Sequence, residues 1–363
     1  MRTDHFSRLL QPLVEKQWLA GAVTCVADQE RILALEAVGF ADLATRRPMR
    51  VDDLFWIASQ TKPVTGTAMM MLVDEGKVSL DDPIERYLPE FKDLMVAVPE
   101  DTETTLLRRP NLPVTVRHIL THTAGMKFSS PVEQPTFDQL TLHQAALSYS
   151  MTPLAADPGT ACEYSNMGVN VAGRIIEVVS GMDYVDFLDS RLFAPLGMRD
   201  TTFWPDDAMC ARLAKTYKPG GANAALEEMP IGQLTQPLQD RSRRPLPAGG
   251  LFSTAADCVR FCQMVMGGGI FGGRRYLSEE AVETMTRKQT GDLSGQFGIG
   301  WKLDGAIGHD GAYGTHMGFD RERGLITVYL VQHAWFHGEG GNGRRIFEER
   351  AREIFAGQSS SGF

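Results

Sequence analysis

FWIASQTKPVTG, residues 55–66, is the stretch around which the rest of this chain is interpreted. Apolar residues lead into Ser59, Lys62 follows three positions later, and the apolar run 67–73 comes next. If Ser59 begins a helix, Ser59 and Lys62 lie one turn apart on the same face. An amine beside a hydroxyl is what a serine needs to become a nucleophile near neutral pH. The alternative is a serine N-cap with a solvated lysine, and this stretch alone leaves both interpretations open.

The composition is that of a globular protein without a nucleic-acid partner. Hydrophobic residues make up 43% and charged residues 22% of the 363 residues, as in an ordinary soluble protein. That length fits roughly two domains, or one domain with a large insertion. The net charge of −9, with no basic run among aromatic residues, argues against a nucleic-acid groove. No apolar stretch approaches a bilayer span, so we expect no membrane span. The oligomeric state stays open.

The cysteines and the N-terminus favour a reducing, cytoplasmic setting. An odd number of cysteines without CxxC spacing makes a disulfide framework or a zinc site unexpected. The five are Cys25, Cys162, Cys210, Cys258 and Cys262. Residues 1–17 form an amphipathic helical pattern that lacks the apolar core and cleavage site of a signal peptide. We therefore expect a cytoplasmic protein.

Strand patterns occur at both ends of the chain, with helical patterns between them. The expected strands are 21–28, 32–40, 298–303, 307–319 and 325–332. Strand signals are scarce from about residue 80 to 244, where 167–180 is a strong amphipathic helix. The pattern predicts one sheet domain made of residues 1–80 and 245–363, with a mainly helical domain, 81–244, inserted between them. A Ser/Gly tail after residue 356 is expected to be disordered.

Two further segments carry candidate site residues. Tyr164 and Asn166 lie in a loop before the helix at 167, where a nearby lysine charge would favour the tyrosinate form. The amide of Asn166 could orient Lys62 or a substrate carbonyl. Alternatively, Tyr164 is a boundary aromatic and Asn166 is the N-cap of the helix.

The third candidate segment is Gly308–Gly314. Here His309 begins a strand, Gly311 permits close backbone approach, and the N–H of Ala312 could face a developing oxyanion. We prefer His309 to His316, because His316 is expected in the middle of the strand. A lone histidine in a strand is more often structural.

The three segments appear in the order Ser-x-x-Lys, Tyr-x-Asn and His-x-Gly. Together they resemble the serine β-lactamase and penicillin-binding-protein superfamily, most closely its class C β-lactamase branch of peptidases and esterases. Supporting stretches are LTHTAG at 120–125 and GGLFST at 249–254. The resemblance implies an α/β (α+β) fold, with an antiparallel sheet flanked by helices plus an all-helical domain.

The resemblance also implies a role for each candidate residue. Ser59 would be the acylated nucleophile, and Lys62 and Tyr164 would share the proton transfers in an order that the sequence does not decide. Asn166 would hold the site together. The backbone N–H groups of Ser59 and Ala312, next to Gly311, would form the oxyanion hole. His309 would take the position of the lysine in the family's Lys-Thr-Gly motif. No cofactor or metal is implied.

The third motif departs from the class C pattern. The fixed cation of Lys-Thr-Gly is replaced by the titratable His309, and its hydroxyl by the anionic Asp310. Both changes should weaken recognition of a substrate carboxylate, unless Asp310 points away from the site, since strand side chains alternate. We therefore expect a carboxylesterase acting on small or medium acyl esters. The alternatives are a D,D-carboxypeptidase, a D-aminopeptidase-like amidase or a weak β-lactamase, and, in another class, a non-catalytic penicillin-binding sensor.

A glycine-rich match and a pair of histidines do not indicate function. The GxGxxG match at 267–272 follows a helix rather than a strand, so a dinucleotide site is not expected. His118 and His122 lie one turn apart without an HExxH pattern, so helix capping or core packing is the expectation for both.

Overall fold

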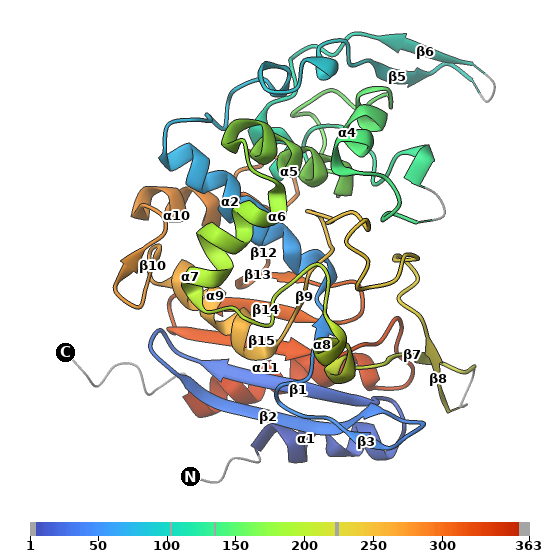
Figure 1. The fold of residues 1–363 in the computed structure, drawn as a ribbon, viewed down its shortest axis with the longest axis vertical. Coiled ribbons are helices and arrows are strands. Elements are labelled where there is room, and N and C mark those ends of the chain that lie inside the picture. The colour runs from blue at the N-terminus through green and yellow to red at the C-terminus, as the bar shows by residue number, and fades with distance from the viewer. Residues whose placement is uncertain (1–4, 102–103, 134–135, 222–224, 356–363) are drawn as a thin grey trace.

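A seven-stranded antiparallel sheet forms the base of the molecule (Figure 1). The computed structural model describes residues 5–101, 104–133, 136–221 and 225–355. The strand order is β12-β13-β14-β15-β1-β2-β3. The bounds are β1 Gly21–Ala27, β2 Ile32–Asp42, β3 Arg47–Pro48, β12 Lys302–Leu303, β13 Ile307–Asp310, β14 His316–Asp320 and β15 Leu325–Leu330. The two ends of the chain meet where β1 pairs with β15, with Val23 opposite Leu330. The expected sheet is therefore confirmed. Residues 1–4 of the helical pattern expected at 1–17, and the tail after residue 356, lie outside the described residues.

Helices cover both faces of this sheet, so the interior strand β1 is buried throughout. Side chains of β1 alternate between the two faces. Ala22 and Val26 belong to a cluster with α1 (His5–Glu15) and α11 (Gly343–Phe355). Val23 and Cys25 belong to the larger core, which includes α9 (Ala255–Met266). Figure 1 shows α1 below β1 and β2 and α9 above them.

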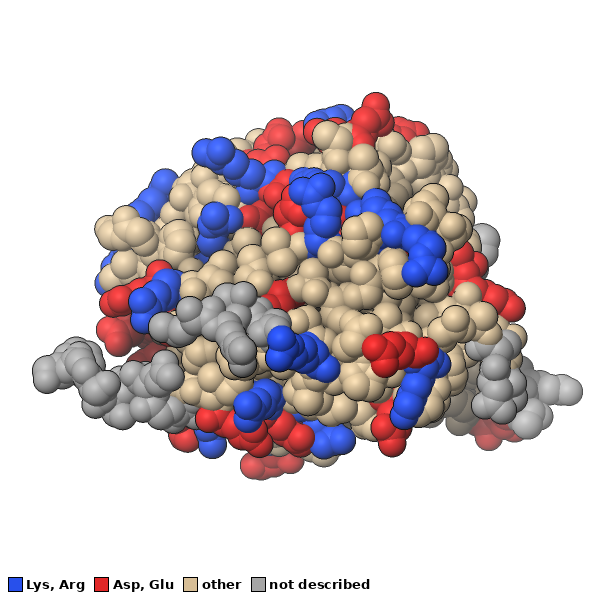
Figure 2. Space-filling view, turned by 90° about the horizontal axis from the view of Figure 1, so that it is seen from below, with Lys and Arg blue, Asp and Glu red and all other residues tan. Residues whose placement is uncertain are grey.

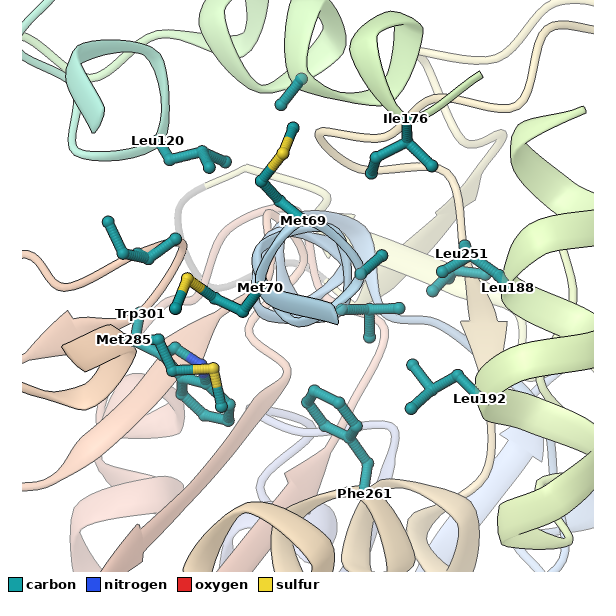
Figure 3. Packing of buried hydrophobic residues seen from close by; sticks show 14 of the residues in the cluster. Met69, Met70, Leu120, Ile176, Leu188, Leu192, Leu251, Phe261, Met285 and Trp301 are labelled. Carbon is teal, nitrogen blue, oxygen red and sulfur yellow. The ribbon is translucent and has the colours of Figure 1, made fainter. Parts of the chain in front are cut away.

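The helix that follows Ser59 runs through the centre of the larger core. This helix, α2 (Thr61–Asp74), is buried on every side over its first twelve residues, as its apolar composition requires. Figure 3 looks along it: Met69 points toward Leu120, and Met70 toward Met285 and Trp301. Helix α5 (Asn166–Ser180) packs against α2. The core thus fixes the first turn of α2, next to Ser59.

One expected strand proves to be two. The run 307–319 was predicted as a single strand, and the structure folds it into β13 and β14 around a turn at 311–315. Gly311 N donates to the carbonyl of Thr315 at 2.8 Å, and Gly314 has φ +83°. A glycine at a left-handed position allows this tight reversal. The placement of His316 in mid-strand was wrong, since His316 is the first residue of β14.

The span 81–244 contains helices and two hairpins. Its longer helices are α4 (Leu142–Ser150) and α5, and shorter ones are α3 Val116–Leu120, α6 Tyr184–Leu188, α7 Ala194–Leu196 and α8 Asp207–Arg212. The hairpins pair β5 (Val96–Pro99) with β6 (Thr105–Arg108) and β7 (Thr216–Pro219) with β8 (Leu226–Met229). Periodicity did not predict these hairpins, because their strands have only four residues each. The division of the chain into two domains stays a proposal.

The remaining short elements close the fold. They are β4 Phe55–Trp56 with β9 Phe252–Ser253, β10 Ile270–Phe271 with β11 Arg274–Arg275, and α10 Glu279–Thr286. Among the described residues, no helix is long and apolar enough to cross a membrane. Basic and acidic side chains are interspersed on the face shown in Figure 2.

Candidate active site

Ser59 lies in a tight turn immediately before α2. The turn is a 3-10 helix, Ala58–Gln60, so Ser59 precedes the α-helix rather than beginning it. Ala58 has φ +47°, a left-handed conformation that costs an alanine free energy. The hydroxyl of Thr61 holds this residue in place, because it donates to the Ala58 carbonyl at 2.7 Å and accepts from Leu251 N at 3.1 Å. The strained turn presents the Ser59 side chain toward Lys62.

Lys62 is fully buried beside Ser59, which rules out the solvated lysine of the alternative interpretation. Its Nζ lies 3.1 Å from Ser59 Oγ, 2.8 Å from Asn166 Oδ1 and 2.7 Å from the Ala248 carbonyl. Burial holds the pKa of Lys62 well below its usual value. A neutral amine has two N–H groups for the two carbonyl oxygens and one lone pair for the Ser59 hydroxyl. The three contacts are compatible with this neutral form, and the lowered pKa favours it.

Tyr164 covers the other side of Lys62. Lys62 Nζ lies 4.6 Å from the centre of the Tyr164 ring. Burial raises the pKa of Tyr164 to about 12, although a hydrogen bond with Ser59 opposes the shift. The phenol therefore keeps its proton at neutral pH. The expectation that lysine would favour tyrosinate fails, because burial of the phenol raises its pKa instead.

Asn166 joins this group through its side chain. It is the first residue of α5 and accepts from Lys62. The helix is capped by Ser165, whose Oγ accepts from Gly168 N at 3.2 Å. Asn166 is therefore not the N-cap, and its amide is available to orient the amine.

His309 faces the same group from β13 as a neutral imidazole. Its Nδ1 lies 2.7 Å from the Asp310 carbonyl, which can only accept, so Nδ1 carries the proton. Its Nε2 is buried, with no hydrogen-bond partner among the described residues. Burial lowers the pKa of His309 to about 3. The ring lies 6.1 Å from that of Tyr164. His309 thus lies beside Tyr164 without supplying a cation.

The Asp310 carboxylate is directed toward the opposite side of the strand. It accepts from His316 Nδ1 at 2.8 Å, forms an ion pair with Arg344 of α11, and lies 3.5 Å from Lys302 Nζ. This is the alternative in which the side chain points away from the site. Its charge still helps to raise the pKa of Tyr164.

Gly311 brings the turn after β13 close to Ser59. A Cβ at this position would lie 2.5 Å from the Ile57 carbonyl and closer still to Thr315 Oγ1. Only glycine allows that approach. Among the described residues, neither Ser59 N nor Ala312 N has a hydrogen-bond acceptor. Both N–H groups therefore stay available for a substrate oxygen.

Sequence analysis missed several residues around Tyr164. His122 was expected to cap a helix or pack in the core. Its ring lies 4.5 Å from the Tyr164 ring, and its Nδ1 accepts from Ser165 N at 3.2 Å. Phe128 and Phe297 lie 6.3 and 6.4 Å from Tyr164 on separate loops. The LTHTAG stretch was the available signal for His122, whereas nothing local marks the two phenylalanines. His118, by contrast, does cap α3.

Comparisons with known proteins identify the family of the chain. The Beta-lactamase family matches residues 6–348. Protein Rv1367c of Mycobacterium tuberculosis is 31% identical over 92% of this chain and 90% of its own length. Esterase EstB of Burkholderia gladioli is 29% identical over 90% of this chain and 88% of its own. The solved structure of EstCE1, a hydrolase with promiscuous acyltransferase activity, has a TM-score of 0.78 at 24% identity, covering 95% and 96% of the two chains.

A mixed α/β fold with a serine, a buried amine and a phenol in contact defines a serine-hydrolase class of protein. The chain belongs to the Beta-lactamase family. The resemblance inferred from the motifs is confirmed, as is the fold class.

Proposed function

We propose that this protein is a carboxylesterase that works through an acyl-enzyme on Ser59. Lys62 takes the proton of Ser59 as Oγ attacks the ester carbonyl, and the oxyanion forms opposite Ser59 N and Ala312 N. Tyr164 gives its proton to the leaving alkoxide as the C–O bond breaks, and Lys62 restores the proton to Tyr164. Water then hydrolyses the acyl-enzyme by the same steps in reverse. The observation that carries the proposal is the buried Lys62, whose Nζ lies 3.1 Å from Ser59 Oγ and whose pKa burial holds well below its usual value.

Charge favours esters over substrates that carry a carboxylate. His309 is neutral at physiological pH, so the third motif supplies no fixed cation. The nearby charge of Asp310 is negative. An anionic substrate group would gain no attraction there. The name of esterase EstB fits an ester substrate.

A D,D-peptidase or weak β-lactamase is the second candidate, since the same nucleophile and base would serve an amide. The chemistry uses a hydroxyl, an amine and a phenol, so we propose no metal or cofactor. A cytoplasmic location remains a prediction from the cysteines.

Burst kinetics with p-nitrophenyl esters test this proposal. We expect one acyl group per active site, a mass increase on intact protein, and loss of both in Ser59→Ala. Ser150→Ala is the matched control, because this serine of α4 donates its hydroxyl to the Leu147 carbonyl at 2.9 Å, within its own helix. Normal turnover by Ser59→Ala would refute the assignment. An adduct that persists for hours would instead favour the sensor alternative. A panel of neutral esters, D-Ala-D-Ala peptides and a cephalosporin separates esterase from peptidase.

A further inference from the structure

The direction of proton transfer fixes where the leaving alcohol must lie, and this inference rests on the proposed function. At the tetrahedral carbon, one bond goes to Ser59 Oγ and the oxyanion faces the N–H groups of Ser59 and Ala312. The leaving oxygen must come within hydrogen-bond reach of the Tyr164 hydroxyl, about 2.6–3.2 Å. The alcohol group attached to that oxygen therefore lies beside the Tyr164 ring, and the acyl group extends elsewhere.

Phe128 provides an aromatic surface at that place. Its ring lies 6.3 Å from that of Tyr164 at an interplanar angle of 28°, in the offset stacked arrangement. Phe128 is 46% exposed and Tyr164 is 37% exposed, so both neighbouring residues keep surface that a substrate can reach. Phe297 has less free surface, because it is partly buried and packs edge-to-face on His122 at 4.7 Å.

The position of Phe128 is fixed by the segment that carries Tyr164. Asn166 N donates to the Phe128 carbonyl at 3.2 Å, and Ser165 Oγ donates to the Lys127 carbonyl at 2.7 Å. Behind the ring, Phe137 packs edge-on at 6.0 Å. These contacts hold the two stacked rings in fixed positions. The exposed surface of Phe128 is therefore in place before a substrate binds.

We propose that Phe128 forms the leaving-group subsite and that the substrates are esters of arylalkyl alcohols. An aromatic ring on the alcohol would pack on the exposed surface of Phe128, next to Tyr164. One methylene between the ring and the ester oxygen makes the leaving group an alkoxide, which needs a proton from Tyr164. A phenolate has a pKa of about 10 and leaves without that help.

Two pairs of esters measure this subsite separately. Benzyl acetate against ethyl acetate varies only the alcohol, and ethyl phenylacetate against ethyl acetate varies only the acyl group. For each pair, the kcat/KM of the aromatic ester is divided by that of ethyl acetate. The first pair gives an alcohol-side ratio and the second gives an acyl-side ratio. When a ratio is compared between variants, the intrinsic reactivity of the esters cancels. In Phe128→Ala we expect the alcohol-side ratio to fall about tenfold, the equivalent of 1.4 kcal/mol. The acyl-side ratio should stay within about twofold, because ring packing contributes only where rings touch.

The controls separate this inference from the proposed function. Phe128→Tyr keeps a ring and should keep the alcohol-side ratio. Val132→Ala removes an exposed apolar side chain, 60% accessible, from the same loop and should change neither ratio. The subsite would be refuted if the alcohol-side ratio were the same in Phe128→Ala and the unmodified protein. It would also be refuted if the alcohol-side and acyl-side ratios fell by the same factor in Phe128→Ala. Failure of the proposed function looks different, since Ser59→Ala would then still hydrolyse every ester.

Discussion

Lys62 connects the chemistry of the site to the stability of the fold. Its pKa is lowered from 10.5 by burial, so between the lowered pKa and 10.5 the unfolded chain binds a proton that the folded chain does not. The unfolded state binds more protons across that window, and folding stability rises with pH there. The same lowered pKa leaves the amine free to accept the Ser59 proton. We expect kcat/KM to rise with pH along an acid limb that reports Lys62.

Lys62→Arg tests the origin of that limb. An arginine stays charged at every accessible pH and cannot accept the Ser59 proton. We expect kcat/KM to fall by about 10²–10⁴-fold, the usual contribution of a general base. A pH profile of kcat/KM from stopped-flow ester hydrolysis measures it. Lys77→Arg is the control, because Lys77 is exposed and paired with Glu75 at 2.8 Å. An unchanged acid limb in Lys62→Arg would remove Lys62 from the mechanism.

Gly311→Ala tests the backbone next to the oxyanion position. The new Cβ would meet the Ile57 carbonyl at 2.5 Å, so the turn bearing Ala312 must move away from Ser59. We expect kcat to fall by about 10²–10³-fold, as when one oxyanion donor is lost, with KM little changed. Gly341→Ala is the control, since its Cβ would have ordinary contacts near 3.8 Å. A normal kcat in Gly311→Ala would mean that Ala312 N does not face the oxyanion.

For single residues, the sequence predicts the neighbours that short spacing along the chain brings together. Ser59 and Lys62 are one turn apart in any helical geometry, and Tyr164 and Asn166 precede a strongly periodic helix. Phe128 and Phe297 reach Tyr164 only through tertiary folding, and their own segments carry no periodic signal. The pKa values also depend on burial, so the lowered pKa values of Lys62 and His309 follow from the packed structure alone.

Between elements, a chain of buried hydrogen bonds runs from an ion pair to the amine of Lys62, the proposed general base. Arg244 Nη2 donates to Glu133 Oε1 at 2.5 Å, and Tyr149 Oη donates to the same carboxylate oxygen at 2.5 Å. Asn170 Nδ2 donates to Tyr149 Oη, and Asn170 Oδ1 accepts from Ala248 N, both at 3.0 Å. The Ala248 carbonyl then accepts from Lys62. The direction of every hydrogen bond in this chain is fixed, because a carboxylate can only accept and an N–H can only donate.

Tyr149→Phe breaks this chain at its middle. The Asn170 amide loses a buried acceptor, which costs about 1–3 kcal/mol of folding free energy. Ala248 should then hold Lys62 less firmly, and we expect kcat per titrated active site to fall about tenfold, equivalent to 1.4 kcal/mol of barrier. Burst titration separates this from a smaller folded fraction. Tyr329→Phe is the control, since that buried hydroxyl has no hydrogen-bond partner among the described residues. If Tyr149→Phe loses stability but keeps its rate per site, the chain is structural only.

Elements with strong periodicity were predictable and short ones were not. The hairpin of β1 and β2 and the helices α5 and α11 follow from their patterns and stops. The split of 307–319 depends on Gly311 and Gly314, whose roles become visible only when the turn packs on Ile57. The hairpins within 81–244 have four residues per strand, too few for a periodic signal to stand out.

For the whole molecule, the packing predicts one cooperative unfolding transition despite the proposed two domains. The larger core joins Val23 of the sheet, Met69 of α2 and Ile176 of α5 without a break. Lys62 is likewise held by Asn166 from one proposed domain and Ala248 from the other. Loss of either part therefore disrupts the site and the core together.

Phe347→Ala measures that cooperativity from the far side of the sheet. Phe347 of α11 is buried, and its ring lies 5.0 Å from Phe6 and 6.1 Å from Tyr329. Truncation should cost about 3–5 kcal/mol. Below the transition, the rate per titrated site should be unchanged, since Phe347 is remote from Ser59. Urea unfolding followed by far-UV circular dichroism and by ester hydrolysis should give coincident curves, both shifted to lower urea. Separate transitions, with activity lost at unchanged urea while the spectroscopic curve shifts, would show that the sheet and the helical part unfold independently.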